Sequence, residues 1–162
     1  MSTRWLDSQE MRAWVRLVAV LELLPGVLDA QLRRDADLTH FDYHVLVVLS
    51  QAREGQLRMT ALADRTHATL PRLSHVVRRL EDRGLVARSP CPDDKRATDA
   101  RLTEAGREKL AAAAPGHVAT ARHNVIDALT PEQLDQLATI ADAVLERLDP
   151  EGAVVKPLDR QA

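Results

Sequence analysis

Apolar residues recur every three or four positions through most of the chain, and this spacing predicts a mainly helical protein. The first such stretch runs from residue 8 to about residue 34. A second covers residues 39–53, where Thr39 and Asp42 form a capping-box pair at the start. Pro25 and Gly26 interrupt the first stretch, so we expect a kink or a break of the helix at that point.

Two more helical stretches follow the middle of the chain. Thr103 caps the first of them, in which Pro115 and Gly116 predict another bend or break. Thr130 opens the second, where Gln133 is placed to complete a capping box. Residues 150–162 follow this last helical stretch, and we expect them to form a loose tail.

The stretch from residue 59 to residue 103 has a different pattern. A short helix and a turn lead to a second helix, which Thr69 caps and in which Pro71 occupies the first turn. Gly84 ends this second helix, as glycine commonly does. Five apolar residues recur along the helix at helical spacing and predict one buried stripe. They are Leu70, Leu73, Val76, Val77 and Leu80.

Two strands are expected after this helix. Residues 85–89 and 99–103 alternate apolar and polar side chains, which is typical of a β-hairpin. The expected loop over residues 90–96 contains two prolines and a basic pair, and residues 57–58 are expected to add a short third strand. A two-helix unit with a basic outer face beside a basic hairpin is a shape suited to duplex DNA.

The face of the second helix opposite its apolar stripe consists of hydrogen-bond donors. These donors are Arg72, Ser74, His75, Arg78 and Arg79. A solvated charged face is the usual interpretation of such a pattern on an isolated helix. The basic hairpin beside this one favours DNA contact instead, with arginine to guanine as the commonest base contact.

The distribution of charge agrees with a DNA-binding role for the same stretch. The whole chain of 162 residues has a net charge of −2, but residues 57–103 hold ten basic and six acidic side chains and carry +4, which leaves −6 for the remainder. Aromatic residues make up only 2% of the chain, and all of them precede this basic segment. Stacking of bases on aromatic rings is therefore not expected, which argues against a protein that binds single-stranded nucleic acid.

The segments LADRT, RLSHVVRRLEDRGLV and PDDKRAT…LTEAG resemble the winged helix-turn-helix of the MarR (multiple antibiotic resistance regulator) family of bacterial transcription factors. The resemblance implies a mainly α (α+β) fold in a single domain over residues 1–162. Its DNA-binding lobe would cover residues 39–103, and long dimerisation helices would lie at residues 8–34 and 104–149. Both terminal regions also carry more apolar surface than one small lobe can cover, which suggests a homodimer.

The resemblance also implies how such a dimer reads DNA. Recognition helix 69–83 would enter the major groove and wing 85–103 would lie at the minor groove. Two recognition helices about one DNA turn apart, ~34 Å, would read an inverted repeat. Members of such families are usually repressors, and a ligand would act by shifting the dimer between DNA-competent and incompetent states.

Individual DNA contacts follow from these segments. Arg96 resembles the wing arginine that family members insert into the minor groove, with Asp94 holding its guanidinium group. Lys95 is an expected phosphate contact, and Thr69 can also reach a phosphate. Pro71 belongs to the same candidate DNA-binding surface, although the family usually has a small hydroxyl residue at that position.

A small-molecule pocket between the dimerisation helices and the DNA-binding lobe is implied by the resemblance alone. Its candidate ligand-binding residues are Trp14, His40, Tyr43 and His44. His40 and His44 are four residues apart on one predicted helix face, and with Glu22 and His117 they faintly resemble the zinc-responsive members of the family. No cysteine joins them, and we expect neither a metal nor a cofactor.

Other classes of protein are disfavoured. Neither a catalytic nucleophile with its base nor a phosphate-binding loop is visible, so we do not expect an enzyme. A protein–protein adaptor that never touches DNA is the alternative from another class. Cys91 is the only cysteine, which rules out a disulfide within the chain, and we expect it to be incidental rather than a redox sensor.

The sequence also predicts the location of the protein and its binding partners. The sequence has no apolar run near the ~18 residues of a membrane span and no signal-peptide core over residues 1–10, so a cytoplasmic protein without a membrane partner is expected. The expected partners are double-stranded DNA, a second copy of the chain and a small-molecule effector.

Overall fold

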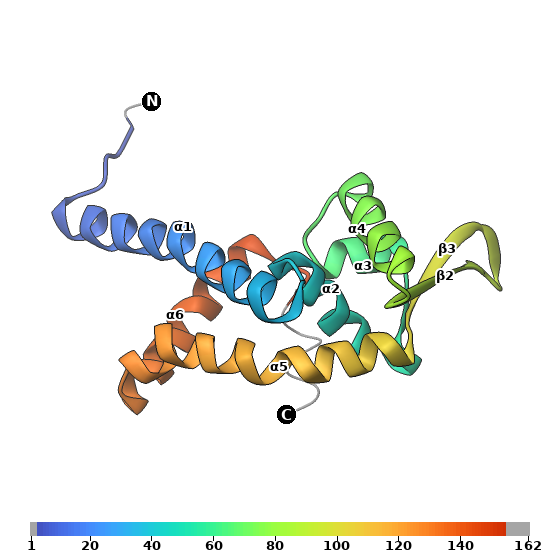
Figure 1. Ribbon diagram of the computed structural model, residues 1–162. Coiled ribbons are helices and arrows are strands. Elements are labelled where there is room, and N and C mark those ends of the chain that lie inside the picture. Colours follow the sequence, from blue (N-terminus) through green and yellow to red (C-terminus); the bar gives the residue numbers. More distant parts are fainter. Residues whose placement is uncertain (1–2, 155–162) are drawn as a thin grey trace.

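The structure is a computed structural model that describes residues 3–154, so the predicted tail beyond residue 154 lies outside the described residues. It is mainly helical with one small antiparallel sheet in the strand order β1-β3-β2 (Figure 1), which confirms the predicted fold class. The elements are α1 (Ser8–Ala36), α2 (His40–Gln51), η1 (Arg53–Gly55), β1 (Gln56–Arg58), α3 (Met59–Arg65), α4 (Leu70–Asp82), β2 (Val86–Cys91), β3 (Asp94–Leu102), α5 (Glu104–Asn124), η2 (Ile126–Ala128) and α6 (Pro131–Leu148).

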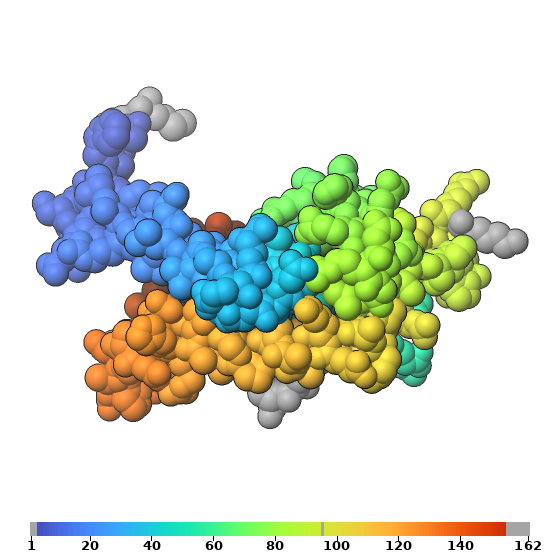
Figure 2. Space-filling view, viewed as in Figure 1, coloured from blue at the N-terminus to red at the C-terminus, as the bar shows by residue number. Residues whose placement is uncertain are grey.

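The molecule is elongated, with the β2–β3 hairpin projecting at one end and the start of α1 projecting at the other (Figures 1 and 2). Helices α1 and α5 pack against each other, and α2, α3 and α4 form a compact group beside the hairpin. Within residues 3–154, no helix is both long and apolar enough to cross a lipid bilayer.

The buried core belongs to this compact group. It is formed mainly by aliphatic side chains of α2, α3, α4 and the sheet, together with the end of α1. Helix α6 contributes no buried residue to it. The largest fully buried apolar side chains are Leu32, Leu38, Val45, Leu46, Leu49, Leu62, Leu73, Val77, Leu80 and Val86.

The predicted N-terminal caps of three helices are confirmed. Thr39 Oγ1 accepts the Asp42 N–H at 2.9 Å, and Asp42 Oδ2 accepts the Thr39 N–H at 2.8 Å, so both halves of the capping box form. Thr103 caps α5, and Thr130 forms the predicted box with Gln133 at α6. These caps satisfy backbone N–H groups that have no partner inside the helix.

A kink or a break was predicted at Pro25 and at Pro115, and of these two alternatives the break is wrong at both prolines. Helix α1 continues through Pro25 and α5 continues through Pro115. A proline inside a helix removes one hydrogen bond, and its ring crowds the carbonyl group four residues earlier. Because α1 and α5 pack along each other, tertiary contacts hold both helices in one piece despite the lost bonds.

The hairpin also departs from expectation, because its strands are longer and its loop is shorter. The strands extend into the predicted loop 90–96 and leave only a tight turn around Pro92. Pro90 is tolerated because β2 is an edge strand, where a missing N–H costs little. The register shifts directly after it, where Cys91 pairs with Asp94.

Two further positions concern the placement of α4. Leu70 was predicted to be buried, but it is 44% exposed because the first turn of α4 extends past the core. Gly84 follows α4 with a φ of 72°, as the predicted helix stop requires.

At the start of α5, a Cβ on Gly106 would lie 2.1 Å from the carbonyl oxygen of Leu85, so only glycine allows α5 to approach the hairpin this closely.

Candidate nucleic-acid interface

Helix α4 presents a polar face outward while its apolar face holds it in the core. Leu73, Val76, Val77 and Leu80 are buried, and Thr69 caps the helix by accepting the Arg72 N–H at 3.4 Å. Pro71, Arg72, His75 and Arg78 are exposed, and Ser74 is half-buried. The structure therefore brings most of the predicted DNA-binding side chains of this helix onto one accessible surface.

The hairpin lies beside this surface but lacks the predicted ion pair. Asp94 Oδ1 accepts the backbone N–H of Arg96 at 3.0 Å, and the described residues contain no salt bridge between these two side chains. Asp94 therefore shapes the turn rather than holding the guanidinium group, which is exposed. The side chain of Lys95 lies outside what the structure describes.

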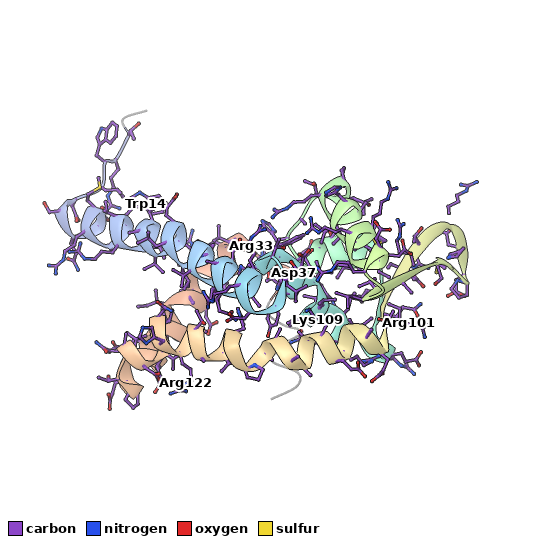
Figure 3. The ribbon with its side chains drawn as sticks, viewed as in Figure 1. Trp14, Arg33, Asp37, Arg101, Lys109 and Arg122 are labelled. Atoms are coloured by element: carbon purple, nitrogen blue, oxygen red, sulfur yellow. The ribbon has the colours of Figure 1, made fainter. Side chains whose placement is uncertain are left out.

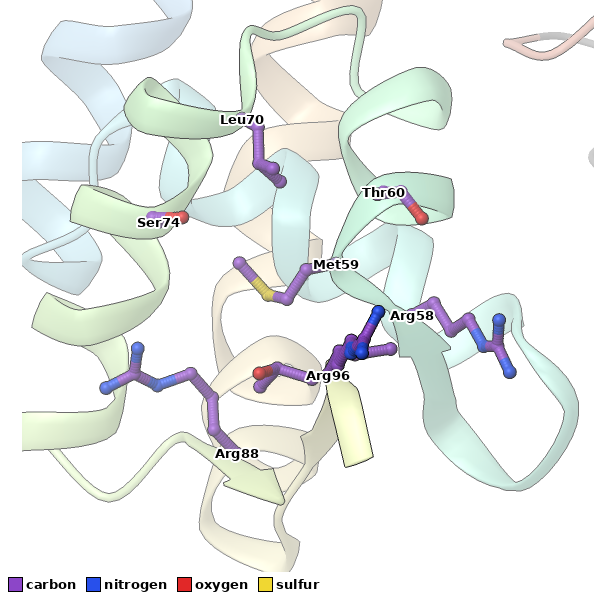
Figure 4. A pocket seen from close by; sticks show the side chains of 9 residues that line it. Arg58, Met59, Thr60, Leu70, Ser74, Arg88 and Arg96 are labelled. Carbon is purple, nitrogen blue, oxygen red and sulfur yellow. The ribbon is translucent and has the colours of Figure 1, made fainter. Parts of the chain in front are cut away.

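A hollow of about 220 Å³ separates α4 from the hairpin. Figure 4 shows Leu70 and Ser74 of α4 facing Met59 and Thr60 of α3 across it. Arginine and hydroxyl side chains dominate the polar part of its lining, a donor set that suits an anionic group such as a phosphate. The full lining is Arg58, Met59, Thr60, Leu70, Ser74, Arg88, Arg96, Ala97 and Thr98.

Two arginines of this hollow were not singled out from the sequence. Arg88 is held by Glu81, with the Arg88 Nη2 and Glu81 Oε2 atoms 2.6 Å apart. This contact lowers the pKa of the Glu81 carboxyl group. Arg58 instead places its Nη2 atom 3.3 Å from the sulfur of buried Cys91. Arg58 was missed because β1 is too short for sequence periodicity to show which way its side chains point.

Arg79 requires a correction, because it was predicted to face DNA. Its Nη2 atom lies 2.5 Å from Oδ1 of Asp42, whose side chain is only 2% exposed. The same carboxylate accepts the capping N–H of Thr39 through its other oxygen. Arg79 therefore ties α4 to the first turn of α2, and its guanidinium group is committed to a buried partner.

Arg72 also contacts α2 but in a different manner. Its Cζ atom lies over the face of the Phe41 ring, 4.3 Å from the ring centroid, which makes this a cation–π contact. Phe41 is half-buried and packs against the core. The first turn of α2 thus contacts two arginines of α4, one through an aromatic ring and one through a carboxylate.

The predicted ligand-binding residues are only partly brought together. Tyr43 and His117 have ring centroids 4.4 Å apart, and His40 stacks on His117 at 5.9 Å. Trp14 requires a correction, because it lies on the projecting part of α1 (Figure 3). Asp29 accepts the His40 N–H, and it follows Trp14 by fifteen residues, or roughly 22 Å of helix.

Buried polar atoms of α5 and α1 lack a hydrogen-bond partner among the described residues. Nδ1 of His117 and Oε1 of Gln31 are buried, and neither atom makes a hydrogen bond within the described chain. The described residues contain no group of three side chains placed to hold a metal ion, so the zinc alternative gains no support from the geometry.

Burial lowers the pKa values of His40, His44 and His117 below the ordinary 6.5, and His40 adds like-charge repulsion to the other two. The folded state therefore resists protonation more than the unfolded chain does. The free energy of unfolding should therefore be highest above about pH 6.5, where these histidines are neutral in both states. It should decline as the pH falls through the lowered pKa values of the folded state.

We expect His117→Asn to reduce this loss of stability, because it removes one of the buried groups. The measurement is the free energy of unfolding in urea at several pH values between about 7.5 and 5. His123→Asn is the control, since His123 is exposed on the same helix. A pH dependence that is identical in His117→Asn and the wild type would contradict this assignment.

The chain was compared with known proteins. A family model described as "MarR family" matches residues 38–98. The crystal structure of Sco3205, a MarR family transcriptional regulator from Streptomyces coelicolor in complex with DNA, is 45% identical, covers 90% of this chain and 95% of that one, and has a TM-score of 0.86. The crystal structure of AbsC, another MarR family transcriptional regulator from S. coelicolor, is 40% identical, covers 90% and 98% of the two chains, and has a TM-score of 0.84.

Curated relatives have similar descriptions. The HTH-type transcriptional regulator YdcH of Bacillus subtilis is 37% identical over 81 residues, and the match spans only 55% of its length and 49% of this chain. The HTH-type transcriptional repressor YetL of the same organism is 25% identical over 137 residues, which cover 81% of its length and 79% of this chain. These relatives are regulators of transcription rather than enzymes.

Proposed function

Because the chain belongs to the MarR family of transcriptional regulators, we propose that it is a homodimeric, ligand-responsive repressor that binds an inverted repeat in duplex DNA. The observation that carries the proposal is the exposed face of α4, where several hydrogen-bond donors lie beside a basic hairpin. The DNA complex of Sco3205 supports the same mode of action, since the two matched chains are 45% identical in sequence. A regulator of transcription works where the chromosome lies, so we place it in the cytoplasm.

The proposed DNA contacts divide by role. Side chains of α4 would enter the major groove, where Arg72, His75 and Arg78 would face base edges. Thr69, Pro71 and Ser74 would lie near the DNA backbone at the start of the helix and beside the hollow. Arg96 of the wing would reach the minor groove, and Lys95 would contact a phosphate.

The hollow between α4 and the wing adds a further contact to this set. Arg58 and Arg96 line it together with several hydroxyl groups, and we propose that it receives a backbone phosphate between the two grooves. Such a contact would set the register of the protein on the duplex without reading sequence.

Dimerisation is supported by the apolar surface that the single chain leaves uncovered. Among the described residues, all but one of the large exposed apolar side chains lie on or before α1, or on α5 and α6, the exception being Leu70. They are Trp5, Leu6, Met11, Trp14, Val15, Leu17, Val20, Leu21, Leu23, Val27, Val118, Leu137, Ile140, Val144 and Leu148. A patch this large is typical of an interface, and a second copy offers the same patch in return.

The position of this apolar surface also indicates which segments form the dimer interface and which bind DNA. Residues 8–34 and 104–149 would form the dimerisation helices, and residues 39–103 would form the DNA-binding lobe within one domain. The cluster of His40, Tyr43 and His117 lies where these parts meet, between α1, α2 and α5. An effector bound there would favour one separation of the two recognition helices over another and so change the population that can bind DNA.

Selection of preferred duplexes from a random pool tests this function, and an inverted repeat is the expected product. Binding to the selected duplex should weaken steeply with salt, by on the order of a thousandfold or more between about 50 and 200 mM, because basic side chains release counterions from the phosphates. A single unrepeated half-site would contradict dimeric reading. Failure to bind any duplex at low salt would favour the adaptor alternative.

A further inference from the structure

We propose that Phe41 is a positioning residue for base reading, because its ring holds the guanidinium group of Arg72 in the orientation that a guanine requires. The inference rests on the proposed function, since it needs α4 in the major groove. It assigns to α2 a part in sequence specificity, although α2 itself lies behind the DNA-facing surface.

The ring and the guanidinium group are placed by different parts of the fold. Phe41 belongs to the first turn of α2 and packs against the buried core, so its ring has little freedom to move. Arg72 is exposed on α4, and its guanidinium group takes part in no hydrogen bond or ion pair of residues 3–154. The stack on Phe41, at 4.3 Å from the ring centroid, is therefore the contact that orients it.

A guanidinium group carries its five N–H donors in one plane and around its edge. Stacking on an aromatic ring uses only the face of that plane and leaves every donor available. A long arginine side chain ordinarily loses rotamer freedom when it binds, and a side chain already held in place loses less. The stack thus prepares Arg72 for two parallel hydrogen bonds to O6 and N7 of guanine.

Arg79 provides an internal comparison on the same two helices. It lies seven residues, or about two turns, after Arg72, and it contacts Asp42, the neighbour of Phe41. The carboxylate accepts a hydrogen bond from Nη2 of Arg79, whereas the ring of Phe41 contacts Arg72 without a hydrogen bond. Adjacent residues of α2 thus make one arginine a structural tie and leave the other free to read a base.

The experiment compares binding of variants to the duplex selected by the wild type and to a random duplex, at one salt concentration. Phe41→Leu should weaken binding to the selected duplex about two- to fivefold, the value of an exposed cation–π contact, and should leave random-duplex binding unchanged. Phe41→Tyr keeps the ring and should behave as the wild type. Arg72→Lys keeps the charge but not the planar fork, so it should lose discrimination between the two duplexes.

A double-mutant cycle separates positioning from a general structural role. In an Arg72→Ala background, Phe41→Leu should cause no further loss of binding to the selected duplex. Equal losses on both duplexes, or a loss that persists without Arg72, would overturn the inference. Unchanged discrimination in Arg72→Lys would overturn it as well, and this surface variant does not disturb the core. A wild type that prefers no sequence would instead refute the proposed function, and the inference with it.

Discussion

Ile140→Lys is expected to dissociate the dimer and to abolish operator binding at concentrations where the wild type binds fully. Ile140 is 63% exposed in the single chain and lies on α6, which contributes nothing to the buried core. In a two-fold dimer the substitution places two unpaired ammonium groups in an apolar interface. Because burying each unpaired charge costs several kcal/mol, the dimer dissociation constant should rise by roughly a thousandfold or more.

The loss of DNA binding follows from the loss of the second half-site. A protomer that binds alone no longer gains from its tethered partner, so affinity falls although no DNA-facing residue has changed. Sedimentation or light scattering measures the mass in solution, and a duplex titration measures binding. Thr139→Lys is the matched control, since it adds the same charge one residue away between the acidic side chains of Asp135 and Asp142. A dimer that survives in Ile140→Lys would show that α6 lies outside the interface.

Arg79→Ala and Arg78→Ala are expected to affect different properties, although the residues are neighbours: the first should lower stability and the second should weaken DNA binding. Arg79→Ala leaves the carboxylate of Asp42 buried without its cationic partner. We expect a loss of about 2–3 kcal/mol in the free energy of unfolding, below the full cost of a buried pair because the Arg79 side chain is 41% exposed. The corresponding fall in melting temperature is about 5–10 °C.

Arg78→Ala should leave stability within about 0.5 kcal/mol of the wild type, because the residue is exposed. Its cost should appear in duplex binding, at about 1–3 kcal/mol if the side chain reaches a base. Urea unfolding and a duplex titration at equal protein concentration give both values for both variants. If Arg79→Ala were as stable as Arg78→Ala, the tie between α4 and α2 would have no energetic importance.

The helices and their caps could be predicted from the chain alone because their causes are local. Apolar spacing predicted the buried face of α4, and a hydroxyl residue three positions before its partner predicted the caps of α2 and α6. The positive charge of residues 57–103 and the polar face of α4 likewise followed from composition and helical period. Together with the family resemblance, these features were sufficient to predict a winged helix-turn-helix.

Errors arose where distant residues decide the outcome. The prolines of α1 and α5 do not break their helices, because the two helices pack against each other. Arg79 was placed with the DNA-facing residues by its helical position, but its partner Asp42 lies 37 residues earlier in the chain. Trp14 was grouped with His40 by residue type, and the length of α1 keeps the two apart.

The sequence by itself determined which segments are helical, where they begin and which stretch carries the positive charge, since hydrogen bonds and side-chain spacing within a few residues control these features. Only the tertiary structure decided which arginines of α4 are free. Arg72 rests on a ring and Arg79 is bound to a carboxylate because folding brings the first turn of α2 against α4. Helical period places both on one face, and a side chain's partner depends on what the fold packs opposite it.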